Sequence, residues 1–324
     1  MGAPLADRRS SPLPSPSRSG GTTRFGPGGA RAGSAFDYVA VGHLTVDLVM
    51  REDRWQCRPG GGAFYSALQA ARLGCRTLLL TQGAEAELLP LITPHLSEIA
   101  VELIPSRRTT VLLTEGSGER RTQRLLSWAG PMRQLPAVNG EILHLAPVAA
   151  ELPEQGLRAD IDTRSHRFIA ITPQGLLRTW PRTGGLLRAA SLPAGSLPPR
   201  FDAAVVSEAE LPNCGPLRTA IARHHAVLAV TMGERPTQLF CDSELRSVPT
   251  VATREPIDDL GAGDVFSAAF FVSLAAGETP EQAARCGNVA AHLRIVGEGA
   301  GAVGRRETIE AALRAHVTAS ARSS

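Results

Sequence analysis

The sequence predicts an α/β fold with a doubly wound, mostly parallel sheet. Short apolar runs bounded by turn residues alternate with helix-like stretches, which is typical of parallel strands joined by crossover helices. At 324 residues and 43% apolar side chains, the chain is long enough for one large unit with a substantial core. The predicted strands cover residues 38–42, 77–80, 142–145, 168–171, 203–206 and 226–230.

Taken in order, the elements begin with a tail. Residues 1–35 are rich in Ser, Pro, Gly and Arg with little to bury, so a disordered N-terminal tail is expected there. The folded domain is expected over 36–306, with helix-like stretches at 63–73 and 216–222. Residues 265–317 look helical throughout and should cover one face, with 307–324 forming a C-terminal helix and tail.

Two stretches interrupt this alternation. They are residues 44–60 and residues 109–128, and in the second, strand-like runs flank Glu-Gly-Ser-Gly-Glu at 115–119. A polar, glycine-containing connection between two such runs predicts a β-hairpin.

Charge and composition exclude several functions. All 34 basic residues are arginine, which rules out mechanisms that need a lysine, such as a Walker A phosphate loop or a pyridoxal Schiff base. The net charge of +3 is concentrated in the two ends of the chain, and no basic cluster interleaved with aromatics remains between them, which argues against a nucleic-acid partner. Since no apolar run could span a bilayer and no hydrophobic signal core is present, we expect a cytoplasmic protein with no membrane partner.

A glycine turn runs directly into an apolar stretch in the last third of the chain. Residues 258–264 read Asp-Asp-Leu-Gly-Ala-Gly-Asp, and the apolar run 265–276 follows. If that run is a helix, the N–H groups of residues 261–264 lie at its N-terminus, where unpaired donors and the helix dipole favour an anion. Asp264 could then take a proton from a hydroxyl that attacks phosphorus. A plain Asp N-cap after a glycine turn is an equally good interpretation.

This segment resembles the Asp-Thr-x-Gly-Ala-Gly-Asp signature of the ribokinase-like (PfkB) carbohydrate kinase family. The resemblance implies that the backbone of Gly261, Ala262 and Gly263 forms an anion hole and that Asp264 is the catalytic base. Asp259 stands where the family usually has Thr, and an added carboxylate there could repel phosphates or help bind magnesium. Further motifs follow in family order over residues 36–306.

On the substrate side, Asp47 follows the first predicted strand, and ligands of open α/β sheets bind beyond the carboxyl ends of strands. The resemblance implies that Asp47 accepts hydrogen bonds from substrate hydroxyls. It also implies that the substrate lies against the backbone of Gly60, Gly61 and Gly62. The glycine-rich motif that contains Tyr65 is similar to that of the inositol-kinase-like branch of the family. The resemblance implies that residues 44–60 and 109–128 form a small, reduced β lid.

The resemblance to that branch also implies that two arginines of this chain could help to bind phosphate. Arg124 belongs to the predicted hairpin, and Arg178 follows the fragment Thr-Pro-Gln-Gly-Leu-Leu. An ordinary surface position is the simpler interpretation for each of them.

On the nucleotide side, the resemblance assigns four residues. Glu208 stands in the acidic position of the family's Asn-x-x-Glu motif, although Val205 replaces its Asn, and would organise magnesium through water without any residue assigned as a direct ligand. A solvated Glu at the start of a helix is an equally good interpretation of Glu208. Thr231 and Gly233 correspond to the nucleotide loop, and Asn288 to the adenine-side helix. ATP and Mg²⁺ are therefore the expected cofactors.

The sequence thus predicts an ATP-dependent phosphotransferase that acts on a hydroxyl of a small sugar or a cyclic polyol such as myo-inositol. A nucleoside kinase is the alternative, disfavoured by an aromatic content of 4%. A catalytically silent polyol-binding regulator of the same fold is a further alternative. No Gly-x-Gly-x-x-Gly follows the first strand, which argues against a dinucleotide-dependent oxidoreductase. With a reduced lid, either a monomer or a homodimer is expected.

Overall fold

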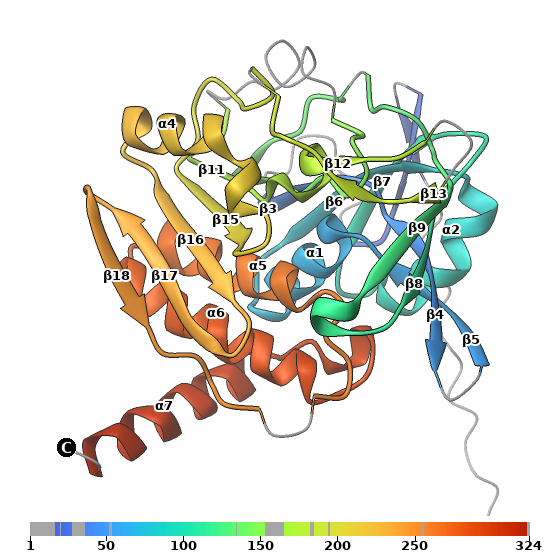
Figure 1. Ribbon diagram of the computed structural model, residues 1–324. Helices are drawn as coiled ribbons and strands as arrows, with labels where there is room; N and C mark the ends of the chain where they lie inside the picture. The colour runs from blue at the N-terminus through green and yellow to red at the C-terminus, as the bar shows by residue number, and fades with distance from the viewer. Residues whose placement is uncertain are drawn as a thin grey trace, which may run out of the picture.

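The computed structural model describes residues 17–19, 21–27, 36–51, 54–133, 135–152, 165–181, 185–193, 195–253 and 256–322. Over these residues a large sheet runs through the molecule (Figure 1). Its strands, in spatial order, are β1 (Ser17–Ser19), β2 (Thr22–Phe25), β7 (Ala100–Pro105), β6 (Thr77–Gly83), β3 (Phe36–Val41), β10 (Gly140–Leu145), β11 (Phe168–Ile171), β15 (Ala203–Ser207), β16 (Val227–Met232), β17 (Arg235–Cys241) and β18 (Glu244–Val248).

The middle of this sheet is parallel. From β7 to β16 every neighbouring pair runs parallel, and antiparallel strands flank this block at both ends. All six predicted strands lie in the parallel block, so the predicted doubly wound α/β class is confirmed. Strand β7 and the hairpin β17–β18 were not predicted.

Helices cover both faces of the sheet. Along β3, Tyr38 and Ala40 belong to one core cluster, while Val39 and Val41 belong to another on the opposite face. The first cluster contains side chains of α1 (Gly62–Arg72) and α2 (Glu85–Ile92), and the second those of α4 (Gly215–His224). Because the strands are buried on both faces, they read as continuous apolar runs in the sequence.

The N-terminal segment departs from the predicted disordered tail. Within residues 1–35 the structure instead has β1 and β2, and β2 pairs with β7. Phe25 and Thr22 are buried, and Glu102 accepts a hydrogen bond from Thr22 Oγ1 at 3.0 Å and pairs with Arg24. One aromatic ring and a strand edge with free hydrogen-bonding groups suffice to dock this stretch. The rest of 1–35 lies outside the described residues.

A second, smaller sheet lies beside the first, and we call it the lid sheet (Figure 1). Its order is β13 (Gly185–Leu186), β9 (Thr122–Ser127), β8 (Thr110–Glu115), β4 (Thr45–Arg51) and β5 (Arg54–Gly60). Both predicted lid segments form hairpins in it, β4–β5 and β8–β9. The short strand β13 adds to them from a part of the sequence that gave no strand signal.

The C-terminal helices are α5 (Ala262–Ala275), α6 (Pro280–Ile295) and α7 (Arg306–Arg322), in line with the helical character predicted for 265–317. Phe266, Phe270 and Phe271 of α5 are fully buried, so this helix is held inside the molecule between α1, α6 and the sheet. Helix α6 starts with a capping box between Thr279 and Gln282. None of the described helices combines the length and apolarity that crossing a membrane requires.

Candidate active site

Asp258 fixes the loop that precedes α5. Its carboxylate pairs with the fully buried Arg294 at 2.9 Å and accepts hydrogen bonds from the N–H groups of Leu260 and Gly299 at 3.1 and 3.0 Å. Burial opposes its ionisation, but Arg294 and these hydrogen bonds outweigh burial and lower the pKa of Asp258 to about 2. The carboxylate therefore stays charged and holds the loop in one conformation.

Gly261 caps α5 in a left-handed conformation, with φ at 80°. A Cβ atom here would lie 2.5 Å from Cδ2 of Tyr65, so the ring packs directly on the glycine backbone. Val265 N–H donates to Gly261 O at 3.0 Å, and Ala262 N–H donates to Asp259 O at 3.3 Å. The N–H groups of Gly263 and Asp264 are thus left for an anion at the positive end of the helix.

Two aspartates lie against glycine backbone. Asp47, which is 2% exposed, lies so close to Gly60 that a Cβ there would be 2.1 Å from Asp47 Oδ2. A Cβ at Gly62 would likewise lie 2.9 Å from Asp264 Oδ1. The glycines expected beneath the substrate therefore also make room for these two carboxylates.

Both aspartates titrate near neutrality. Burial raises the pKa of Asp264 to about 7, although Arg178 opposes the shift, and the charges of Glu210 and Asp47 add to it. Burial also raises the pKa of Asp47 to about 6, against the hydrogen bond that Thr45 Oγ1 donates at 2.6 Å. A carboxylate whose pKa lies near the working pH is well matched to general-base catalysis.

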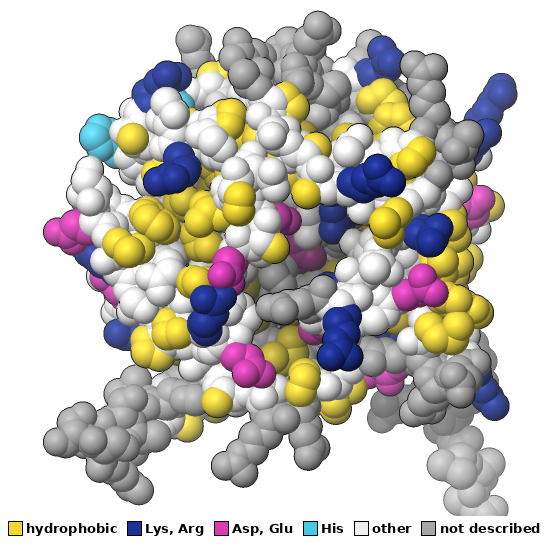
Figure 2. All heavy atoms as spheres, in the orientation of Figure 1, with side chains coloured by type: hydrophobic (Ala, Val, Ile, Leu, Met, Phe, Trp, Pro, Cys, Tyr) yellow, Lys and Arg dark blue, Asp and Glu magenta, His cyan; other side chains and the backbone are white. Residues whose placement is uncertain are grey.

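The aspartates face a common cavity of about 50 Å³, which Gly61, Gly62, Tyr65 and Gly261 also line. A larger cavity of about 410 Å³ adjoins it. The residues that line both are Arg121, Gln123, Gln174 and Arg178. Figure 2 shows acidic and basic side chains next to one another in a hollow near the middle of this face. Charges of both signs thus surround the carboxylates.

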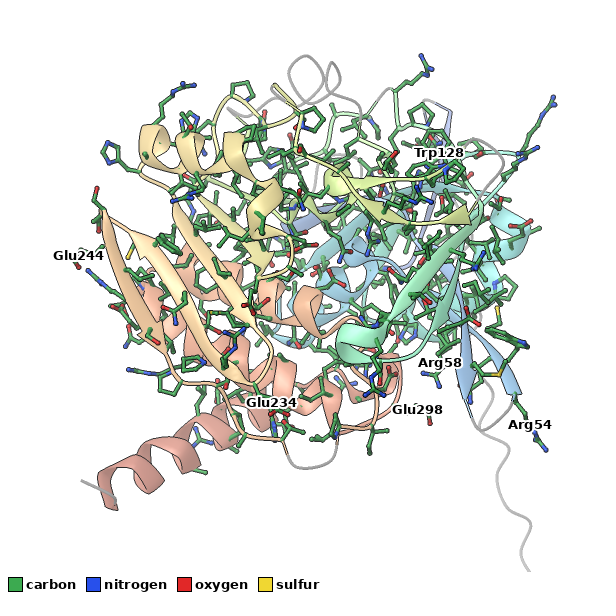
Figure 3. The ribbon with its side chains drawn as sticks, viewed as in Figure 1. Arg54, Arg58, Trp128, Glu234, Glu244 and Glu298 are labelled. Carbon is green, nitrogen blue, oxygen red and sulfur yellow. The ribbon has the colours of Figure 1, made fainter. Side chains whose placement is uncertain are left out.

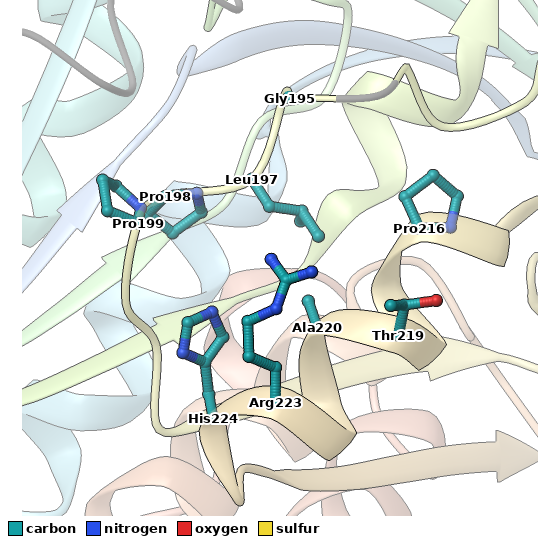
Figure 4. Close-up of a pocket in the computed structure, with 9 residues that line it drawn as sticks. All are labelled: Gly195, Leu197, Pro198, Pro199, Pro216, Thr219, Ala220, Arg223 and His224. Carbon is teal, nitrogen blue, oxygen red and sulfur yellow. The ribbon is translucent and has the colours of Figure 1, made fainter.

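A third cavity of about 570 Å³ lies against α4 (Figure 4). Pro198, Pro216, Arg223 and His224 are among its lining residues. It shares no described lining residue with the cavities at Asp264, and no carboxylate is among its described lining, so it has no part in this site.

Sequence reasoning missed four residues of the site: Arg121, Gln123, Gln174 and Glu210. The alternation of side chains along β9 is a signal that could have found two of them, because Arg121 and Gln123 share a face while Arg124 points the other way. Arg124 is exposed and lines neither cavity.

Arg178 and Glu210 are held by their own hydrogen bonds. Arg178 donates to Val148 O at 2.9 Å and to Gln123 Oε1 at 2.8 Å. Glu210 Oε2 accepts from both N–H and Oγ of Ser207, each at 2.8 Å. These bonds hold a positive and a negative group in the lining of the larger cavity.

Three of the four residues expected at the nucleotide lie together. Glu208 N–H donates to Thr231 O at 2.9 Å, and Gly233 lies in the following β16–β17 turn. The Glu208 side chain is 47% exposed and pairs with Arg235. Asn288 is different, since its amide accepts from Thr237 Oγ1 at 2.8 Å and donates to Pro249 O at 3.0 Å. Its hydrogen-bonding groups join α6 to β17 and the segment after β18.

The chain matches known proteins along most of its length. A family model described as pfkB family carbohydrate kinase matches residues 33–305. Ribokinase from Bacillus subtilis (strain 168) is 38% identical over 92 residues, which are 28% of this chain and 31% of that protein. The chain thus spans less than a third of that relative's length.

Two solved structures have the same fold. One is a pyrophosphate-dependent kinase in the ribokinase family, complexed with a pyrophosphate analogue and myo-inositol, with a TM-score of 0.69 and 21% identity over 84% of this chain and 99% of that one. The other is Arabidopsis thaliana ribokinase complexed with ribose and ATP, with a TM-score of 0.65 and 17% identity over 86% and 99%. These likenesses show the fold, and the family model, which matches residues 33–305, shows that the chain belongs to the pfkB family of carbohydrate kinases.

Proposed function

We propose that this kinase transfers a phosphoryl group from ATP to a hydroxyl of a small sugar or a cyclic polyol such as myo-inositol. The observation that carries the proposal is the meeting of Asp264, at the N-terminus of α5, with Asp47 in one small cavity. One carboxylate can hold an acceptor hydroxyl there while the other removes its proton.

In this mechanism Asp47 accepts hydrogen bonds from the acceptor, whose ring lies against Gly61 and Gly62. Asp264 takes the proton of the reacting hydroxyl as its oxygen bonds to phosphorus and the bond from phosphorus to the donor's bridging oxygen breaks, which leaves ADP. The N–H groups of Gly263 and Asp264 and the dipole of α5 stabilise the charge on the phosphoryl oxygens.

Glu208 and Glu210 suit the way proteins usually hold Mg²⁺, through one or two carboxylates while phosphates and water supply the other ligands. Within the described residues no group of three or more His, Cys, Asp or Glu could hold a metal alone, so the donor's phosphates would complete the site. Bound magnesium would neutralise charge on those phosphates.

The cavity lining favours a polyol over a nucleoside. Among the described residues that line the two cavities at Asp264, Tyr65 is the aromatic side chain, and it packs on Gly261. The lining also supplies amide, guanidinium and carboxylate groups, and these bind hydroxyls better than they bind a nucleobase.

Pyrophosphate is a second candidate donor. Asn288, expected on the adenine side, uses its amide within the protein, whereas Arg121 and Arg178 line the cavity next to Asp264. A site that offers arginines to the phosphates and few groups to an adenine ring would suit a donor that consists of phosphates alone.

The test is a matrix of donors and acceptors with the full chain. ATP and pyrophosphate are each combined with myo-inositol, ribose, fructose and adenosine, and the phosphate ester is identified by ³¹P NMR. We expect the highest kcat/KM with a cyclic polyol or sugar. A preference for adenosine would show a nucleoside kinase, and tight polyol binding without turnover would show a silent regulator.

The pH dependence of turnover gives a prediction of its own. Because Asp264 must be deprotonated to act as the base, kcat should rise about tenfold per pH unit on the acid side and level off above a midpoint near pH 7. The measurement is kcat at saturating acceptor and donor from pH 5 to 8.5. A flat profile over this range would rule out a titrating base with a raised pKa.

A further inference from the structure

The lid sheet is tied to the loop before the anion hole by two arginines. Arg58 of β5 pairs with Asp258 at 2.9 Å and also with Glu298, which lies next to it at the foot of the lid (Figure 3). Arg121, at the start of β9, pairs with Asp259. Each lid hairpin therefore contacts one of the two consecutive carboxylates, Asp258 and Asp259, in the loop that leads to Gly261.

The contact at Asp259 has two parts. At the tip of the β8–β9 hairpin, the 3₁₀ turn η2 (Gly118–Arg120) places Gly118 N–H 2.8 Å from Asp259 Oδ2. The Arg121 guanidinium pairs with the other oxygen, Oδ1. The carboxylate thus bonds both the backbone and the side chain of the hairpin tip, and its charge is offset by Arg121 and not directed at an incoming phosphate.

Arg121 also faces the reacting groups. It lines the cavity that holds Asp47 and Asp264 and the larger cavity beside it. Its charge lowers the pKa of both aspartates against the effect of burial, so its guanidinium lies within electrostatic reach of each carboxylate. With no lysine in the chain, the side chains that carry a permanent positive charge next to the transferred group are arginines.

We propose that Arg121 contacts the transferred phosphoryl group, and that Asp259 is a positioning residue that holds Arg121 in place when the lid is closed. This inference rests on the proposed kinase function. A guanidinium has five N–H donors, so it can pair with Asp259 and still donate to a phosphoryl oxygen. Since Arg121 belongs to the lid, the positive charge would be completed only by a closed site, from which water is excluded.

Other arginines near the site are less suited to this role. Arg178 donates to Val148 O and to Gln123 Oε1, so much of its guanidinium is already used by bonds within the protein. Arg120 is exposed at the hairpin tip, and Arg124 lies on the opposite face of β9. Arg120 therefore provides a matched control.

The kinetic experiment uses Arg121→Gln, Asp259→Thr, Asp259→Asn, the double variant R121Q/D259T and the control Arg120→Gln. We expect Arg121→Gln to lower kcat by about 100-fold, as the loss of one preorganised transition-state donor does. Asp259→Thr should lower kcat by about tenfold, and the double variant should be no slower than Arg121→Gln alone, because the two residues act as one unit. Arg120→Gln should match the wild type.

Asp259→Asn separates positioning from simple tethering. Its amide oxygen can still accept from Gly118 N–H, but the NH₂ group that replaces the other oxygen cannot accept from Arg121, and the side chain has no negative charge to form an ion pair. If Asp259 serves to place Arg121, Asp259→Asn loses kcat as Asp259→Thr does. Wild-type kcat in Asp259→Asn, or a tenfold loss that persists in the Arg121→Gln background, would overturn the proposal.

Two further measurements do not depend on turnover. Amide hydrogen exchange over residues 115–122 should be faster in Asp259→Thr than in the wild type, and pyrophosphate should bind Arg121→Gln about tenfold more weakly by calorimetry. A wild type that phosphorylates no acceptor would end the proposed function, yet these readouts would still test the lid contact. Unchanged exchange together with unchanged pyrophosphate affinity would overturn it.

Discussion

Replacing Asp264 with asparagine should lower kcat by about 1,000-fold, the range in which general bases contribute. The amide has nearly the same shape but cannot accept the proton of the acceptor hydroxyl. Its backbone N–H remains, so binding of a non-hydrolysable ATP analogue should stay within about twofold of the wild type by calorimetry. Turnover near the wild-type value would remove Asp264 from the role of base.

The same variant should be more stable than the wild type above neutral pH. A carboxyl whose folded pKa is raised favours folding while it is protonated, and this contribution is lost as the pH rises from about 4 through the folded pKa near 7. At pH 8, Asp264→Asn should therefore gain about 4 kcal/mol of unfolding free energy, a gain that fades towards pH 4. Urea unfolding at both pH values measures it.

The control is Glu141→Gln. Glu141 lies at the amino end of β10 and is 60% exposed, in an ion pair with the equally exposed Arg167. Removing this charge should change stability by less than about 1 kcal/mol and leave kcat unaltered. A stability gain in the control equal to that of Asp264→Asn would mean that overall charge, and not the buried site, is responsible.

Replacing Gly261 with alanine should lower kcat by at least about 100-fold, because it moves the N–H groups that form the anion hole. The left-handed backbone alone costs an alanine about 1 kcal/mol. The new Cβ would also meet the Tyr65 ring at 2.5 Å. That ring is 1% exposed and lies 5.2 Å from the guanidinium of Arg294, so it has no room to withdraw. The loop must shift instead.

Gly277→Ala provides the matched control. Gly277 follows the C-terminus of α5 with φ at 94°, and nothing lies within 4 Å of the position of its Cβ. This variant should show the backbone cost of about 1 kcal/mol with full turnover. Thermal unfolding and kcat of the two variants, measured in parallel, separate strain from misplacement of the anion hole. Equal kcat losses in both would contradict the role given to the Tyr65 contact.

The parallel core of the fold could be predicted from the sequence because its strands are buried on both faces and read as uninterrupted apolar runs. Strands such as β13, with two residues, and β2, in a polar and glycine-rich segment, gave no such signal. They form because an existing sheet edge offers hydrogen bonds, which is a tertiary effect. Because β2 gave no strand signal, the tail around Phe25 was predicted to be disordered.

For the candidate site, the glycine-rich turn and Asp47 could be found from motifs, and the structure brings Asp264, Asp47 and the glycines together. Whether Asp259 faces a phosphate or a partner could not be read from the sequence, since its partner Arg121 is far away in the chain. Glu210 was overlooked beside Glu208 because only the fold decides which of two neighbouring acids faces the cavity.

The attachment of both lid hairpins to the consecutive carboxylates Asp258 and Asp259 has a thermodynamic consequence. In the proposed mechanism the lid covers the acceptor, whereas the loop bearing these carboxylates continues into the groups that would receive the donor. Any free energy that one ligand spends or gains in moving the lid is therefore felt by the other. By linkage, the acceptor changes the affinity for the donor by the same factor as the donor changes the affinity for the acceptor. If both ligands favour the closed lid, the ternary complex forms cooperatively whichever ligand arrives first.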